Sequence, residues 1–310
     1  MKNSIIILVP FFGKWPEWAH LYFETLRRNN TIDFLFYTDC DASIIKAPNI
    51  QFKKLSFDAY VQMASSKLGF QITPSNAYKL CDLRPMFGYI HQHDFKGYEY
   101  YGWLDMDLLL GDVRSFYTPE VLDKYDVFST HAHTISGHFA LFRNISRNRE
   151  MYKNIYRWKE ALNNSEFVGI DEHGITNAYL QTVFDKFNEK YNVKISNFIT
   201  RFFSNRRNRK LYRVEQYTTP FLSRPWIDGT LNSQQPDIWY YNDGIITNER
   251  DTDRKFMYLH FMNFKSSQWR HDGTKAPWEG RQICNAKVED MNAGLVINKK
   301  GIFPLDGMLR

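Results

Sequence analysis

The stretch "YYGWLDMDLLLGDV", residues 100–113, places Asp105 and Asp107 inside an otherwise apolar run. Such a run is typical of a buried strand. Residues two apart on a strand point to the same side, so the pattern predicts that the two carboxylates converge at a strand end, with Leu104 and Met106 packing on the other face. Neighbouring carboxylates repel each other, and a divalent cation that prefers oxygen ligands, Mg²⁺ or Mn²⁺, removes that repulsion.

The segments around this stretch predict an α/β fold with a parallel sheet. Apolar runs at 4–9 and 32–39 flank an amphipathic helix at 17–30, and this strand–helix–strand order predicts a right-handed crossover unit. Ligands in open α/β sheets bind outside the carboxyl ends of the strands, where the aspartate pair is expected. We expect further strands at 49–57, 98–110, 125–131, 138–144 and 255–264, helices at 75–95, 149–164 and 174–192, a hairpin at 237–249, and an irregular tail.

The composition is that of a globular protein, with 43% hydrophobic and 24% charged residues. Cys40, Cys81 and Cys284 lack the spacing of a metal site and are predicted to be reduced thiols of a cytoplasmic protein. Pro10 interrupts the first apolar run before it reaches the length of a signal-peptide core. No window approaches the roughly 18 apolar residues that predict a membrane span.

The formal net charge of +6 suits a polyanionic partner, and the densest basic cluster is "RFFSNRRNRKLYR", residues 201–213. The cluster is either a solvated surface or a patch that faces anionic lipid, because phenylalanines alternate with arginines. We predict peripheral association with the inner face of a bacterial cytoplasmic membrane. No nucleic-acid recognition motif accompanies the charge, so nucleic acid is not an expected partner.

The segment "WLDMDLLLGDV" resembles the core motif of nucleotide-sugar glycosyltransferases of the GT-A fold, closest to the family-8 type. The resemblance implies that Asp107 binds the metal and that Asp105 is shared between the metal and the donor ribose. It also implies one GT-A-type domain over 1–310, with a mostly parallel central sheet, flanking helices and a decorated C-terminal third. Its parts would be a nucleotide-binding half (1–130), an acceptor half with a late metal-ligand motif (131–270) and a C-terminal tail (271–310).

Two further stretches resemble the parts of that family that face the donor. "AYKLCDLRP" is similar to the helix upstream of the aspartate pair, which implies donor contacts for Lys79, Asp82 and Arg84. "SGHFALFRN" is similar to the segment under the donor sugar. There Gly137 would let a sugar approach the backbone, and His138 would belong to the polar rim.

A late stretch, "YLHFMNFKSSQW", resembles the family's His-Phe…Lys…Trp motif. The resemblance implies that His260 is the third metal ligand and that Lys265 donates to the diphosphate. Asn263 stands where the family has a glycine. Phe11 either lies against the nucleotide base or only turns the chain after the first strand.

The catalytic candidates are Asp171 and Glu172, which precede a predicted helix; only Asp171 matches the family's acidic motif. A carboxylate there would be the general base of an inverting enzyme, or would position the acceptor in a retaining one. The resemblance favours retention, whereas the residues alone leave both open. Both acids also suit a helix N-terminus.

The predicted activity is metal-dependent transfer of a hexose, most simply from a UDP-hexose, to a saccharide or lipid-linked saccharide acceptor. The resemblance implies a role in surface polysaccharide synthesis, lipopolysaccharide O-antigen or capsule. Two alternatives remain open, a nucleotidyltransferase and a carbohydrate-binding relative without turnover. Plain readings also exist, with Asp105 and Asp107 as turn acids and His260 as a core histidine.

Overall fold

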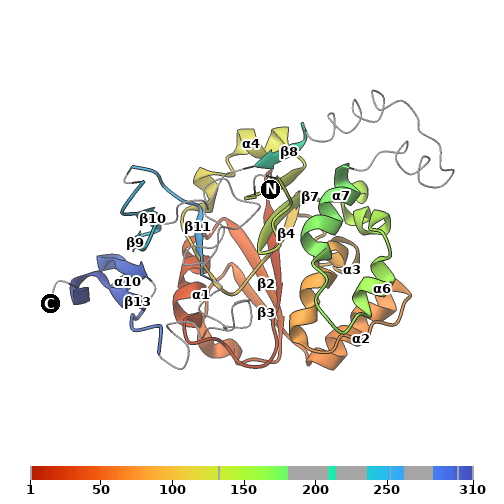
Figure 1. Cartoon of the computed structure of the whole chain (residues 1–310), viewed down its shortest axis with the longest axis horizontal. Coiled ribbons are helices and arrows are strands. Elements are labelled where there is room, and N and C mark those ends of the chain that lie inside the picture. The colour runs from red at the N-terminus through yellow and green to blue at the C-terminus, as the bar shows by residue number, and fades with distance from the viewer. Residues whose placement is uncertain are drawn as a thin grey trace.

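A computed structural model describes residues 2–131, 133–180, 209–213, 236–251, 253–261, 282–298 and 300–308. This part of the chain forms a seven-stranded sheet, a four-stranded sheet and a two-stranded sheet, with helices packed beside the large sheet (Figure 1). The strands, in chain order, are β1 (Ile5–Pro10), β2 (Ile32–Thr38), β3 (Ile50–Lys54), β4 (Tyr100–Leu104), β5 (Leu108–Leu110), β6 (Val127–Ser129), β7 (Phe139–Arg143), β8 (Leu211–Arg213), β9 (Ile238–Asn242), β10 (Ile245–Asn248), β11 (Tyr258–His260), β12 (Leu295–Asn298) and β13 (Gly301–Pro304).

The helices are short and vary in type. The α-helices are α1 (Ala19–Arg28), α2 (Phe57–Leu68), α3 (Phe87–Ile90), α4 (Pro119–Lys124), α5 (Ser146–Arg149), α6 (Trp158–Leu162), α7 (Ile175–Leu180) and α10 (Asp290–Ala293). The 3₁₀ helices are η1 (Ala42–Ile44), η2 (Ala77–Met86), η3 (Val113–Ser115), η4 (Met151–Asn154) and η8 (Leu305–Met308), and η5 (Ile170–Gly174) is a π-helical turn.

The large sheet has the order β3-β2-β1-β4-β7-β6-β8. The pairs β1–β2, β2–β3, β1–β4 and β6–β8 are parallel, while β7 runs antiparallel to both of its neighbours. The predicted α/β class with a mostly parallel central sheet is therefore confirmed. The carboxyl ends of β1 and β4 lie side by side, which brings the chain after Pro10 close to the chain after Leu104.

Both faces of the sheet are buried, as the apolar sequence of β1 predicts. Ile5, Ile7 and Val9 pack in one hydrophobic cluster with α1, and Ile6 and Leu8 pack in a second cluster. The second cluster contains residues of α2, α3 and α7, and Figure 1 shows these helices on the side of the sheet opposite to α1.

The expected strand at 98–110 is wrong in one respect that matters for the site. The strand β4 ends at Leu104, and β5 begins only at Leu108, so both aspartates lie in the connection between them. The strand β5 leaves the large sheet and pairs antiparallel with β11, with Leu108 opposite His260 and Leu110 opposite Tyr258. We call this pair the β5–β11 ribbon.

Two predicted helices are also corrected. The region 75–95 begins as the 3₁₀ helix η2 and becomes α-helical only at α3, after Pro85. The region 149–164 is three short pieces, α5, η4 and α6, and Arg157 before α6 has φ 49°. The helix is interrupted here, and Tyr152 packs edge to face on Trp158 across the break.

The C-terminal part is more regular than expected. The hairpin β9–β10 is confirmed, and its turn residues Asp243 and Gly244 both have positive φ, as a tight primed turn requires. The sequence analysis predicted an irregular tail, whereas β12 and β13 complete a four-stranded sheet with this hairpin. The predicted domain boundaries stay a prediction.

Candidate metal and donor site

The connection Asp105–Met106–Asp107 is fixed by hydrogen bonds from three distant segments. The Asp105 amide donates to the His138 carbonyl at 2.9 Å, and the Phe261 amide donates to the Asp107 carbonyl at 3.0 Å. The Trp18 indole, at the start of α1, donates to the Met106 carbonyl at 2.8 Å. The two aspartates therefore converge because this turn is held in place, not because they alternate along one strand.

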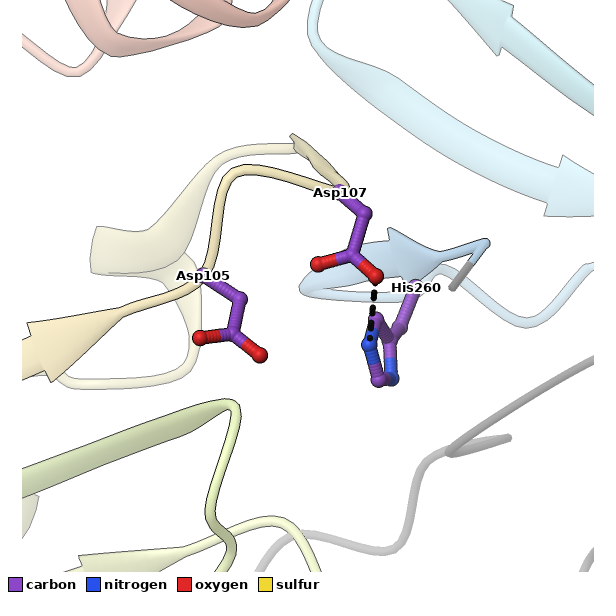
Figure 2. Close-up of side chains that lie close together, drawn as sticks. All are labelled: Asp105, Asp107 and His260. Carbon is purple, nitrogen blue, oxygen red and sulfur yellow. Dashed lines mark ion pairs between the residues drawn. The ribbon is translucent and has the colours of Figure 1, made fainter. Parts of the chain in front are cut away.

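The two carboxylates meet His260, which comes from the ribbon partner β11 (Figure 2). One ligand atom from each of Asp105, Asp107 and His260 lies within 4.8 Å of the others, and His260 Nε2 is 3.3 Å from Asp107 Oδ2. Asp107 and His260 are buried, whereas Asp105 is partly exposed. Two carboxylates and an imidazole are a donor set that fits Mn²⁺ or Mg²⁺, so these residues can hold a divalent cation.

Arg84 links the aspartate turn to the catalytic candidates. Its guanidinium donates to an Asp105 carboxylate oxygen, to Asp171 Oδ2 at 2.9 Å and to the Gly137 carbonyl at 2.7 Å. The side chain of Arg84 is 12% exposed, so a single cation joins two carboxylates at a partly open surface. Asp105 is thus shared between the possible metal position and a permanent cation.

Asp171 and Glu172 lie in the π-helical turn η5, next to Gly137. A Cβ at position 137 would come within 2.7 Å of Glu172 Oε1 and 3.0 Å of Asp171 Oδ2, so the missing side chain makes room for the carboxylates. Burial raises the pKa of the Asp171 carboxyl to about 8, although the Arg84 cation opposes this. Asp171 Oδ1 is buried and has no hydrogen-bond partner among the described residues, and a buried acid with a raised pKa is a candidate functional group.

Lys79 and Asp82, also on η2, are enclosed. The Lys79 ammonium is 2.8 Å from Asp82 Oδ2 and also donates to the carbonyls of Ala161 and Glu166. The Asp82 carboxylate accepts from the backbone amides of residues 168–170. In this structure the pair anchors the loop that leads to η5. Its predicted donor contacts stay a prediction.

A cavity of about 280 Å³ opens beside the aspartate turn at the carboxyl ends of β1 and β4. Phe11, Arg84 and Asp105 line it. Their predicted contacts with the donor stay a prediction. Tyr78, which was not predicted from the sequence, also lines the cavity, is 41% exposed and packs edge to face on Phe167. The available signal was an aromatic residue directly before Lys79 in a stretch already expected to face the donor.

The His138 side chain packs directly against the His260 ring. Its ring stacks on the His260 ring with centroids 4.2 Å apart, and its Nε2 lies 2.5 Å from the Tyr258 hydroxyl. Since His138 is 5% exposed, its observed contacts orient a metal-ligand candidate. The prediction that it lines the donor sugar stays a prediction.

Several predicted features lie partly or wholly beyond the described residues, including 181–192 of the predicted helix and 262–264 of the last predicted strand. Lys265 falls outside them, as does 201–208 of the basic cluster, while the end of that cluster forms β8. None of the helices in the described ranges has both the length and the apolar character that a bilayer crossing needs.

The fold and site together define an α/β protein with a candidate divalent-cation site at the carboxyl edge of its sheet. A family model covers residues 7–292, and the chain belongs to that family, described as a family of unknown function (DUF6625). No curated protein matches the chain. The likeness to family-8 glycosyltransferases remains a resemblance of motifs.

The solved structures that are similar to the chain include the following three. The galactosyltransferase LgtC in complex with donor and acceptor sugar analogues is 11% identical, with a TM-score of 0.41 over 83% of this chain and 87% of that chain. An active-site mutant of LgtC is 8% identical, with a TM-score of 0.32 over the same shares. The glycosyltransferase GlyE of Streptococcus pneumoniae TIGR4 is 9% identical, with a TM-score of 0.29 over 69% of this chain and 46% of that chain.

Proposed function

We propose that this protein is a metal-dependent glycosyltransferase that moves a hexose from a nucleotide sugar, a UDP-hexose, to a saccharide acceptor. The observation that carries the proposal is that the Asp105–Asp107–His260 cluster adjoins an aromatic-lined cavity through Asp105, which lines it. A nucleoside suits the aromatic part of such a cavity, and a diphosphate suits its cationic and metal-binding end.

Asp105, Asp107 and His260 would hold the cation, Mn²⁺ or Mg²⁺. When bound, such a cation neutralises the charge that grows on a departing diphosphate, which is worth several kcal/mol. Phe11 and Tyr78 would flank the base, since both line the cavity. Lys265 remains the candidate second donor to the diphosphate.

Asp171 and Arg84 would act on the sugar side. Arg84 holds Asp171 and Asp105 in fixed positions, so the transferred sugar would lie between the metal position and η5. Asp171 is buried beside the Arg84 cation, which suits positioning of the acceptor, and its pKa is raised to about 8, which suits proton transfer. Of these two roles the motif resemblance favours the first, and with it retention, and Glu172 is the second candidate.

The proposal extends to the cellular setting predicted from the sequence. The acceptor would be a saccharide or a lipid-linked saccharide of a surface polysaccharide, lipopolysaccharide or capsule. The enzyme would be cytoplasmic and peripheral on the membrane through residues 201–213. Loss of binding to anionic liposomes on neutralising Arg206 and Arg207, with no loss on neutralising Lys54, would support that location.

The decisive experiment measures thermal stabilisation by UDP, alone and with Mn²⁺, together with slow hydrolysis of a panel of UDP-sugars. The unmodified chain should show a metal-dependent shift and hydrolyse one donor. Asp107→Asn should lose both, while Asp58→Asn, an exposed acid of α2, should keep both. Preference for a triphosphate would indicate a nucleotidyltransferase. Absence of any metal-dependent shift would leave a carbohydrate-binding relative.

A further inference from the structure

A second cavity, of about 490 Å³, lies at the opposite end of the β5–β11 ribbon. Asp107 directly precedes β5 and Gly111 directly follows it, and the Gly111 amide donates to the Met257 carbonyl at 2.8 Å. The ribbon thus carries metal-ligand candidates at one end and lines this second cavity at the other. We call it the distal cavity; its lining includes Asn30, Arg114, Phe116, Ile245 and Lys255.

Arg114 is a cation without a carboxylate partner in the described part of the chain. Its guanidinium donates to the carbonyls of Asn3 and Thr31, both at 2.9 Å, and to Thr31 Oγ1 at 3.2 Å. These neutral acceptors fix the group without cancelling its charge. Burial lowers the pKa of this guanidinium, and no carboxylate of the described residues forms an ion pair with it.

The other charges of the distal cavity leave a basic surplus. Lys255 is exposed and has no ion pair among the described residues. Arg28 is bound by Glu24 and Asp243, which uses the Asp243 carboxylate. Asp112 also lines the cavity and caps η3 by accepting from the Arg114 and Ser115 amides, which leaves its negative charge in place. Arg28, Arg114 and Lys255 against Asp112 and Asp243 leave a surplus of one positive charge, and Arg114 and Lys255 have no carboxylate partner among the described residues.

The rest of the lining is uncharged. Asn30 is exposed and makes no side-chain hydrogen bond within the described ranges, so its amide is available to a ligand. Phe116 is half-buried and Ile245 is 42% exposed, which gives the cavity an apolar wall. A ligand for this cavity needs a negative charge, neutral hydrogen-bonding groups and an apolar face, within the 300–1,000 Å³ usual for small-molecule sites.

We propose that the distal cavity binds a carboxylate-bearing sugar unit, such as a uronic acid. Its carboxylate would be held by Arg114 and Lys255 and its hydroxyls by Asn30, while Phe116 and Ile245 contact the apolar face of the ring. Arg114 Nε and Nη2 are used by Thr31 and Asn3, whereas Nη1 makes no hydrogen bond within the described ranges and can donate a charge-assisted hydrogen bond to a carboxylate oxygen. The site is separate from the metal and donor site, so binding here requires neither metal nor nucleotide and does not depend on the proposed function.

The test is calorimetric titration of the full chain, free of metal and nucleotide, with a uronic-acid disaccharide. The methyl ester of the same disaccharide and inorganic phosphate are the competing probes. Lys255→Gln should weaken binding of the acid about tenfold. Arg114→Gln should weaken it further, and Lys54→Gln, on β3, should leave it unchanged. Because Arg114 also ties two loops together, Lys255→Gln decides the outcome if Arg114→Gln fails to fold.

A second variant separates this site from the first. Asp107→Asn should leave binding of the disaccharide unchanged, whereas it removes the metal-dependent response to UDP. The proposal is overturned if the methyl ester binds as tightly as the acid, if phosphate binds as tightly as the disaccharide, or if Lys255→Gln has no effect. Loss of disaccharide binding in Asp107→Asn would also overturn it, because the sugar would then occupy the metal and donor site.

Discussion

Two groups of charged side chains on the same 3₁₀ helix, η2, have opposite fates. Lys79 and Asp82 are 2% and 0% exposed in their side chains, and backbone groups take up their remaining hydrogen-bonding capacity. Arg84, two residues later, binds Asp105 and Asp171 at the edge of a cavity. A structural ion pair therefore differs from a candidate functional one in its burial and in whether its polar atoms already have hydrogen-bond partners, and not in its residue types.

The largest effect is expected from Asp82→Asn. Removing the negative charge leaves the buried Lys79 ammonium without a counter-charge and weakens the hydrogen bonds to the amides of residues 168–170. The unfolding free energy should therefore fall by about 3 to 5 kcal/mol. Urea denaturation measures this loss. Lys153→Gln removes an exposed pair with Glu150 and should change stability by less than about 1 kcal/mol. If Asp82→Asn lost only a little unfolding free energy, the Lys79–Asp82 pair would have to be regarded as a candidate functional pair instead.

Asp107→Asn should have the reverse profile, with little loss of stability and a large loss of turnover. Donor hydrolysis should fall about 100- to 1,000-fold, since an interaction with developing charge is removed. Turnover is measured at saturating Mn²⁺ and stability in its absence. Equal rates for the variant and the unmodified chain would remove this carboxylate from the chemistry.

Arg84→Lys tests the role of the arginine at the edge of the cavity while its positive charge is preserved. A lysine is a point charge and cannot reproduce the planar fork that joins two carboxylates and a carbonyl. The KM for the donor should rise about tenfold, with the unfolding free energy nearly unchanged. Arg149→Lys is the matched control, because that arginine binds Asn144 and Ser146 rather than a carboxylate. Similar kinetic changes in both variants would contradict the assignment.

The last prediction concerns Asp171 and is a dependence of stability on pH rather than a loss at one pH. Its folded-state pKa, about 8, lies above the ordinary value of 3.8, so the folded chain holds this proton while the unfolded chain releases it. Its contribution to stability therefore falls as pH rises from about 4 to about 8, by at most about 1.4 kcal/mol per unit. Relative to the unmodified chain, Asp171→Asn should gain stability over that range. A difference that stays constant with pH would contradict the raised pKa.

The first half of the sheet could be predicted because its signals are local. The strands β1 and β2 are apolar runs, and α1 has helical spacing. In the four-stranded sheet, the Asp243–Gly244 turn is likewise a local signal for the β9–β10 hairpin. The helix α2 was missed, although Ser56 at its N-cap and Gly69 at its C-cap are sequence signals for a helix. The sequence therefore contains enough local information to predict α2.

The rest depends on partners far away in the chain. The turn at Asp105–Asp107 is set by Trp18, His138 and Phe261, none of which lies within 30 residues of it. The grouping of Asp105, Asp107 and His260 was expected from the motif resemblance, and the structure brings their ligand atoms together. The enclosure of Lys79 could not be expected, because it is created by the 161–170 segment.

The β5–β11 ribbon has a consequence for biosynthesis. Its strands are separated by about 150 residues, so β5 stays without its partner on the ribosome until residue 260 has emerged. Until then the nascent chain exposes Leu108–Leu110 and cannot bring His260 to Asp105 and Asp107. We therefore expect chaperone contact with this segment during translation, and any cation binding by these three residues only after residue 260 has emerged.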